Sequence, residues 1–99
     1  MTRPPPFRNV LVTGATSGIG RACAEWLARR GAERIFFCGR DEERLGSVAE
    51  RLRALGADAR PERLDVSDAD AARDWIRRCD AEAPLDLVFA NAGMSADGR

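Results

Sequence analysis

The stretch VLVTGATSGIGRA, residues 10–22, decides the fold. An apolar, β-branched run of strand length breaks at Gly14, and apolar residues at helical spacing follow from Ile19. A loop between a buried strand and a helix presents backbone N–H groups and the positive end of the helix dipole. The stretch therefore predicts a strand, a glycine loop suited to an anion, and a helix.

Beyond this stretch, short β-rich runs alternate with longer amphipathic runs. Strands are predicted at residues 9–13, 34–38, 59–64 and 85–90. Pro61 removes a backbone donor and so indicates that the third strand lies at a sheet edge. Strands separated by helices imply right-handed crossovers and a parallel sheet covered on both faces. The order βαβαβαβ predicts an α/β fold, the N-terminal part of a Rossmann-like doubly wound parallel sheet, with one edge of the fourth strand unpaired.

The first two predicted helices have clear ends. The first closes at Gly31 after basic residues, and the second begins at Asp41 as N-cap and closes before Gly56. Their apolar positions are Ile19, Cys23, Trp26 and Leu27 in the first helix, and Leu45, Val48, Leu52 and Leu55 in the second.

The third predicted helix opens at Ser67. Asp70 follows three residues later, which resembles a capping box. We expect this helix to bury Ala72, Ile76 and Cys79, and to end before Pro84. For Trp26 and Trp75 the sequence leaves two interpretations, a residue of the core or a residue of an oligomer contact.

Composition limits the chemistry of the 99 residues. Lys plus Arg and Asp plus Glu each number 16, and all the basic residues are Arg. This balance gives no case for nucleic-acid or membrane-surface binding. The chain has no signal-like apolar run, so we expect a cytoplasmic protein with a Pro-rich lead-in at residues 1–8 and one partial domain at residues 9–99.

The three cysteines are odd in number and widely spaced. Cys23, Cys38 and Cys79 each lie in an apolar segment. They are expected to be small buried side chains in a reducing compartment, and neither a disulfide frame nor a metal site is predicted.

The glycine loop has three glycines and three hydroxyls within residues 13–20. Gly14 suits the turn, Gly18 suits close approach of a phosphate, and Gly20 suits packing of the helix on the strand. A Walker-type loop is disfavoured because the chain has no lysine. A methyltransferase-like loop and a glycine turn without ligand remain open.

Three motifs carry a family resemblance. TGATSGIG at residues 13–20 is similar to the TGxxxGxG motif of the short-chain dehydrogenase/reductase family, and NAG at residues 91–93 to its NNAG motif, with Ala90 replacing the first Asn. Asp65 and Val66 match a third family position after the third strand. The resemblance covers residues 9–94 and implies binding of a nicotinamide dinucleotide.

The resemblance also implies a role for each matched position. Asp65 accepts a hydrogen bond from the adenine amino group, and the Val66 backbone contacts the ring. The implied cofactor-binding residues are Gly14, Thr16, Ser17, Gly18, Ile19, Gly20, Arg40, Asp65, Val66, Asn91, Ala92 and Gly93. Without a ligand, Asp65 would only precede a helix cap and residues 91–93 would only end a strand.

Arg40 favours NADP over NAD. A guanidinium makes a forked, charge-assisted contact with a 2′-phosphate, whereas Gly39 offers nothing to hold a 2′-hydroxyl. In similar proteins a basic residue at this position accompanies NADP, although many also have a second basic residue where this chain has Ser17. The alternative is that Arg40 is a solvated charge.

The family's catalytic residues are missing. Its members use a Tyr-x-x-x-Lys pair and a Ser to transfer hydride between the cofactor and a carbonyl or alcohol substrate, but this chain has neither Tyr nor Lys, and Ser95 lies too early. No catalytic residue is predicted. Three interpretations follow: the front of a longer oxidoreductase, a nucleotide-binding module completed by a partner chain, or a non-catalytic remnant. The substrate and any homo-oligomer are left open.

Overall fold

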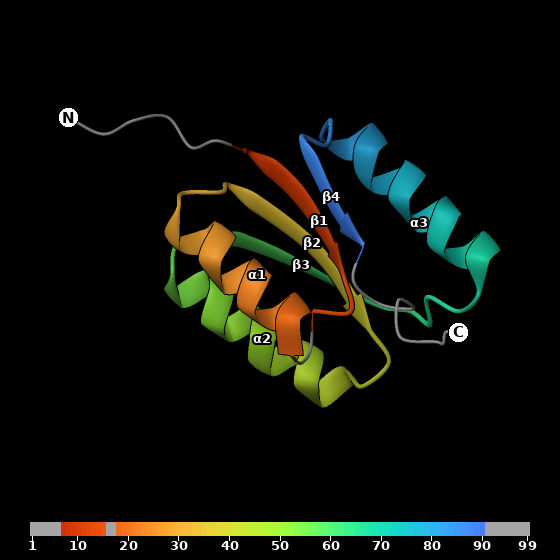
Figure 1. Cartoon of the computed structure of the whole chain (residues 1–99), viewed down its shortest axis with the longest axis horizontal. Helices are drawn as coiled ribbons and strands as arrows, with labels where there is room; N and C mark the ends of the chain where they lie inside the picture. The colour runs from red at the N-terminus through yellow and green to blue at the C-terminus, as the bar shows by residue number, and fades with distance from the viewer. Residues whose placement is uncertain (1–6, 16–17, 91–99) are drawn as a thin grey trace.

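Four parallel strands form one sheet in the order β3-β2-β1-β4 in a computed structural model, which describes residues 7–15 and 18–90 (Figure 1). The strands are β1 (Asn9–Thr13), β2 (Arg34–Gly39), β3 (Asp58–Arg63) and β4 (Leu87–Ala90). Each neighbouring pair is parallel. The α/β fold, the parallel sheet and the edge position of β3 are therefore confirmed.

Three helices cover the sheet. They are α1 (Gly18–Arg29), α2 (Glu42–Ala54) and α3 (Ala69–Glu82). Figure 1 shows α1 and α2 side by side, with α3 on the other side of the sheet. With right-handed crossovers, helices lie on one face of the sheet while the chain adds strands in one direction, and on the other face once that direction reverses. Here the chain moves outward from β1 to β3 and then returns to place β4 on the other side of β1.

The core has two parts because β1 is buried on both faces. Val10 and Val12 point into the cluster beneath α1 and α2. Leu11 points into the cluster beneath α3, which includes Phe36 and Trp75. Side chains alternate along a strand, so a strand covered on both sides needs the continuous apolar run that the sequence has.

The predicted ends of the first two helices are confirmed. Asp41 is the N-cap of α2, and its Oδ1 accepts hydrogen bonds from the backbone N–H groups of Glu43 at 2.9 Å and Arg44 at 3.3 Å. Gly31 and Gly56 follow α1 and α2 with φ of 96° and 99°, the left-handed conformation of a helix C-terminus.

The predicted start of the third helix is wrong by one residue. Asp68, not Ser67, is the N-cap of α3, and its Oδ1 accepts a hydrogen bond from Ala71 N at 3.1 Å. The Ser67 hydroxyl instead donates to Asp65 Oδ1 at 2.7 Å. Because that hydroxyl turns back toward Asp65, the neighbouring carboxylate caps the helix.

The predicted buried face of α3 is partly wrong. Trp75 and Cys79 are buried, whereas Ala72 and Ile76 are only half-buried. Trp75 is 2% exposed and fills the space over Leu11. The bulk of the indole therefore sets which side of the helix faces the sheet.

The predicted apolar face of α1 also needs correction. Leu27 is buried, but the side chains of Ile19 and Trp26 are 70% and 51% exposed and Cys23 is half-buried. The other buried positions of α1 are small residues: Gly20, Ala24 and Ala28. Small residues let the helix approach the sheet closely, so its larger side chains lie to the side.

The remaining differences concern strand ends and cysteines. β4 begins at Leu87 rather than Leu85, because Leu85 N donates to Asp80 Oδ1 at 2.9 Å instead of joining the sheet. Cys38 and Cys79 are buried as predicted, Cys23 is half-buried, and all three are free thiols.

None of the helices that the structure describes has the length and apolar character needed to cross a bilayer.

Candidate functional site

The candidate site lies along the edge of the sheet where the parallel strands end. Thr13 is the register partner of Ala90, and Gly39 is the partner of Arg63. These four residues are the last of their strands. The segments that follow all four strands therefore start along one edge, where ligands of open α/β sheets bind.

The loop between β1 and α1 depends on two glycines in the left-handed conformation. Gly14 has φ of 66° and Gly18 has φ of 61°. A Cβ built on Gly18 would meet no described atom within 4 Å, so the backbone borders open space. Ala15 N donates to Cys38 O at 3.3 Å and ties the start of the loop to β2. The predicted residues Thr16 and Ser17 lie outside the described residues.

The N-terminus of α1 has the positive end of the helix dipole. Its first turn, which includes Ile19 and Gly20, has no acidic residue. The first turns of α2 and α3 do have acidic side chains, namely Glu42, Glu43 and Asp70. Since the first N–H groups of a helix have no partner within the helix, the N-terminus of α1 is the best suited of the three to an anion.

A hollow of about 400 Å³ lies beside the ends of β2 and β3. Arg40, Arg63, Leu64 and Asp65 line it. Arg40 Nη1 lies 3.9 Å from Asp65 Oδ2, and the two side chains are 80% and 50% exposed. The structure thus brings together Arg40 and Asp65, which the sequence predicted for different parts of one nucleotide.

Asp65 is held in one orientation. Its Oδ1 accepts hydrogen bonds from the backbone N–H of Ser67 at 2.9 Å and from the Ser67 hydroxyl at 2.7 Å. These bonds, and then the charge of Arg40, lower the pKa of the Asp65 carboxyl. The carboxylate is an ionised acceptor at neutral pH, and its Oδ2 is the oxygen that pairs with Arg40.

Two further predicted positions follow the strands. Val66 is half-buried and packs against the cluster beneath α3, which anchors the segment after β3. Asn91, Ala92 and Gly93 lie outside the described residues. β4 ends at Ala90 beside Thr13, the residue before the glycine loop.

Cys38 lies beneath the glycine loop. Burial raises the pKa of its thiol above the ordinary value, while a hydrogen bond from the Gly14 backbone acts to lower it. Burial likewise raises the pKa of Cys79 to about 11. Both thiols are protonated at neutral pH, so neither is suited to nucleophilic chemistry. Within residues 7–15 and 18–90, no cluster of His, Cys, Asp or Glu could hold a metal ion.

Sequence reasoning missed Arg63. It ends β3 opposite Gly39 and lines the same hollow as Arg40. The sequence signal that could have indicated Arg63 is its position two residues before Asp65, at the end of the same strand. Its register partner Gly39 has no side chain, so the space beside Arg63 is left unfilled from that strand.

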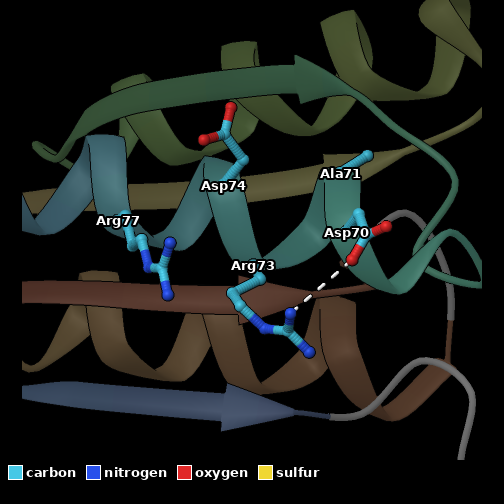
Figure 2. Close-up of a pocket in the computed structure, with 5 residues that line it drawn as sticks. All are labelled: Asp70, Ala71, Arg73, Asp74 and Arg77. Atoms are coloured by element: carbon cyan, nitrogen blue, oxygen red, sulfur yellow. Dashed lines mark ion pairs between the residues drawn. The ribbon is translucent and has the colours of Figure 1, made fainter.

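A second hollow, of about 460 Å³, lies on α3 (Figure 2). Figure 2 shows Arg73 and Arg77 pointing to one side of the helix and Asp74 to the other. Arg73 pairs with Asp70 at 3.6 Å, and Asp74 pairs with Arg78 at 3.7 Å. No predicted site residue lines this hollow, which is a charged surface of the helix.

Comparisons with known proteins agree with the geometry. The model of the family described as short chain dehydrogenase matches residues 8–99. An oxidoreductase of uncharacterised function from Myxococcus xanthus is 51% identical over 89 residues, which cover 89% of this chain and 35% of that protein.

Solved structures share the fold. A 3-oxoacyl (acyl-carrier-protein) reductase from Agrobacterium tumefaciens with NADP bound has a TM-score of 0.76 and 40% identity, covering 86% of this chain and 33% of that one. An alcohol dehydrogenase from the archaeon Thermococcus sibiricus, complexed with 5-hydroxy-NADP, has a TM-score of 0.72 and 30% identity, covering 82% and 35%. The chain spans about a third of the length of these relatives.

Proposed function

The chain belongs to the short chain dehydrogenase family, and from this premise we propose that it is the dinucleotide-binding part of an oxidoreductase that transfers hydride between NADP(H) and a carbonyl or alcohol substrate. The main support for the proposal is that the candidate residues lie along one edge of the sheet. The glycine loop, Arg40 and Asp65 follow three neighbouring parallel strands, at the edge where these strands end. We further propose that residues 9–99 form this partial domain and residues 1–8 its lead-in.

The residues present fit a dinucleotide. Gly18 borders open space where a phosphate needs to approach the backbone, and α1 has no acidic residue in its first turn. We assign the pyrophosphate to the loop and first turn of α1, formed by Gly14, Thr16, Ser17, Gly18, Ile19 and Gly20. Backbone N–H groups donate there, and a Cβ at Gly18 would occupy the ligand's space.

The adenosine end would occupy the hollow beside β2 and β3. Asp65 would accept a hydrogen bond from the adenine amino group through Oδ2, because Oδ1 already accepts two hydrogen bonds from Ser67. The Val66 backbone borders the adenine ring. Asn91, Ala92 and Gly93 are assigned to the ribose region, on the strength of the motif and of the end of β4 beside Thr13.

NADP is proposed over NAD because of charge. Arg40 is 80% exposed, so it reaches a 2′-phosphate without burial of an unpaired charge. Gly39 has no side-chain acceptor for a ribose 2′-hydroxyl. Two structural relatives are named with NADP or a derivative bound.

The reaction needs groups that this chain lacks. The nicotinamide, when bound, supplies or accepts the hydride. A proton must then be given to or taken from the substrate oxygen, and the 99 residues contain no Tyr, Lys or His for that role. Catalysis therefore requires further residues, either from a longer chain or from a partner.

A non-catalytic dinucleotide-binding module is the second candidate, favoured by that same absence. Titration of the complete gene product with NADPH and NADH, followed by nicotinamide fluorescence, tests the binding proposal. Saturable binding supports it, and failure to bind either dinucleotide contradicts it. Oxidation of NADPH with a panel of carbonyl compounds then separates the two candidates: turnover supports the enzyme, and binding without turnover on any of them supports the module.

A further inference from the structure

Two arginines from neighbouring strands line one hollow. Arg63 is the last residue of β3, and Arg40 follows the last residue of β2. Leu64 N donates to Gly39 O at 2.9 Å, which holds the segments carrying these arginines side by side. Arg40 and Arg63 both line the hollow of about 400 Å³, together with Leu64 and Asp65.

Arg63 differs from most of the arginines that the structure describes, because it has no ion-pair, hydrogen-bond or ring partner among the described residues. Within residues 7–15 and 18–90, ten arginines form ion pairs with acidic side chains. Arg53 donates to Ala59 O, and Arg30 lies over the Trp26 ring. In that part of the chain only Arg63 and Arg77 are left without such a contact.

Charge explains why Arg40 alone is insufficient for a phosphate. Arg40 is already paired with Asp65, so the two together contribute no net charge to the hollow. The first turn of α2, which begins two residues after Arg40, adds Glu42 and Glu43. A phosphate monoester carries up to two negative charges at neutral pH and would be repelled by these carboxylates. Of the two arginines that line the hollow, Arg63 is the one whose positive charge is not paired with a described carboxylate.

We propose that Arg63 binds the 2′-phosphate of the dinucleotide together with Arg40, so that two strands provide one phosphate clamp. The proposal rests on the proposed function. Arg63 is a specificity residue: it distinguishes a phosphorylated from an unphosphorylated ribose and takes no part in hydride transfer.

Calorimetric titration of the complete gene product with NADP⁺ and NAD⁺ tests this. Arg63→Gln is expected to raise the Kd for NADP⁺ about tenfold and to leave that for NAD⁺ within about twofold, as for loss of one charge-assisted contact at an exposed site. Arg63→Lys keeps the charge and should lose less. Arg77→Gln is the matched control. Arg77 lies on α3 and is the other described arginine without a described partner, so both Kd values should stay unchanged.

The outcomes separate this inference from the proposed function. If Arg63→Gln leaves NADP⁺ binding unchanged while Arg40→Gln weakens it, the assignment of Arg63 is overturned and the proposed function stands. Equal weakening of NADP⁺ and NAD⁺ by Arg63→Gln also overturns the assignment, because it indicates a structural effect. If the unsubstituted protein binds neither dinucleotide, the proposed function fails and the inference with it.

Discussion

Arg40 Nη1 lies 3.9 Å from Asp65 Oδ2, which links the segment after β2 to the segment after β3. The pair is solvent-exposed, so its own contribution to stability is small. The pair is important because of where its two charged groups lie. The guanidinium assigned to the phosphate and the carboxylate assigned to the adenine share one hollow, and each changes the charge that a nucleotide meets there.

Replacement of Arg40 should change cofactor preference. A charge-assisted contact contributes roughly 1.5–3 kcal/mol, so Arg40→Ala is expected to weaken NADPH binding about tenfold to a hundredfold and to spare NADH. Fluorescence titration with both dinucleotides measures this. Arg29→Ala, which removes an exposed arginine paired with Glu25 at the far end of α1, is the control. Equal loss of NADPH and NADH binding would refute the assignment.

Replacement of Asp65 should have the opposite effect on preference. Asp65→Asn removes the negative charge that pairs with Arg40, while the amide oxygen still accepts from Ser67. The adenine is common to both dinucleotides, so any loss at the adenine cancels in the ratio of their Kd values. We expect the preference for NADPH over NADH to increase about threefold, the scale of one screened charge. An unchanged or reduced ratio would contradict this electrostatic role.

Replacement of Gly18 should lower both the stability of the fold and the affinity for a dinucleotide. Its φ of 61° costs a non-glycine residue roughly 1–2 kcal/mol, so Gly18→Ala should lower the free energy of unfolding by that amount. The new methyl would also enter the open space assigned to the phosphate, and we expect dinucleotide binding to weaken at least about tenfold.

Gly46 provides the matched control for this substitution. It lies exposed inside α2, and a Cβ there meets no atom within 4 Å. Gly46→Ala should therefore raise the free energy of unfolding by about 0.5–1 kcal/mol without changing binding. Urea denaturation and dinucleotide titration of both variants measure the two effects. If Gly18→Ala binds as tightly as the unsubstituted protein, the phosphate does not approach this glycine.

The sequence predicted the fold well where backbone chemistry decides the structure. The apolar run of β1, the cap at Asp41 and the glycines at positions 31 and 56 each have one dominant local cause. It failed where two neighbouring side chains compete, as Ser67 and Asp68 do for the cap of α3. Periodicity also could not show which helix face meets the sheet, because that depends on the bulk of Trp75 and the small residues of α1.

The candidate site was predictable only in part for the same reason. Arg40 and Asp65 were predicted from the family resemblance, and Arg40 also from its charge, but their contact depends on the register between β2 and β3. Arg63 becomes visible only once that register pairs it with Gly39.

Trp75 should be the largest single contributor to the cluster beneath α3. It is 2% exposed and packs with Leu11, Phe36 and Cys79. Truncation of a large buried aromatic side chain costs about 3–5 kcal/mol, so Trp75→Ala is expected to lower the free energy of unfolding by that amount. Trp75→Phe keeps an aromatic ring and should cost less. Urea denaturation of both variants measures this, and similar losses would show that the indole is not packed as described.

Stability should fall in acid because three carboxylates are held by donors. Hydrogen bonds from Arg60 to Asp58, from Ser67 to Asp65, and from the Asn9 backbone to Asp86 lower the pKa of these three carboxyl groups. A carboxyl whose pKa is lower in the folded state stabilises the fold above the unfolded value of about 3.9, and that stabilisation is lost as the pH falls through the folded value. The urea midpoint should therefore decrease below about pH 4.

Asp86 allows a direct test of this linkage. Its Oδ2 accepts hydrogen bonds from the backbone N–H groups of Arg8 and Asn9, each at 2.8 Å, and so ties the start of β1 to the residue before β4. Asp86→Asn should lower the urea midpoint at neutral pH. The difference from the unsubstituted protein should narrow as the pH falls below about 3.9, because Asp86 gains a proton while the Asn amide is neutral throughout. Asp70→Asn, with a side chain 95% exposed, is the control and should lose less. A difference for Asp86→Asn that stays constant with pH would show that its charge does not stabilise the fold.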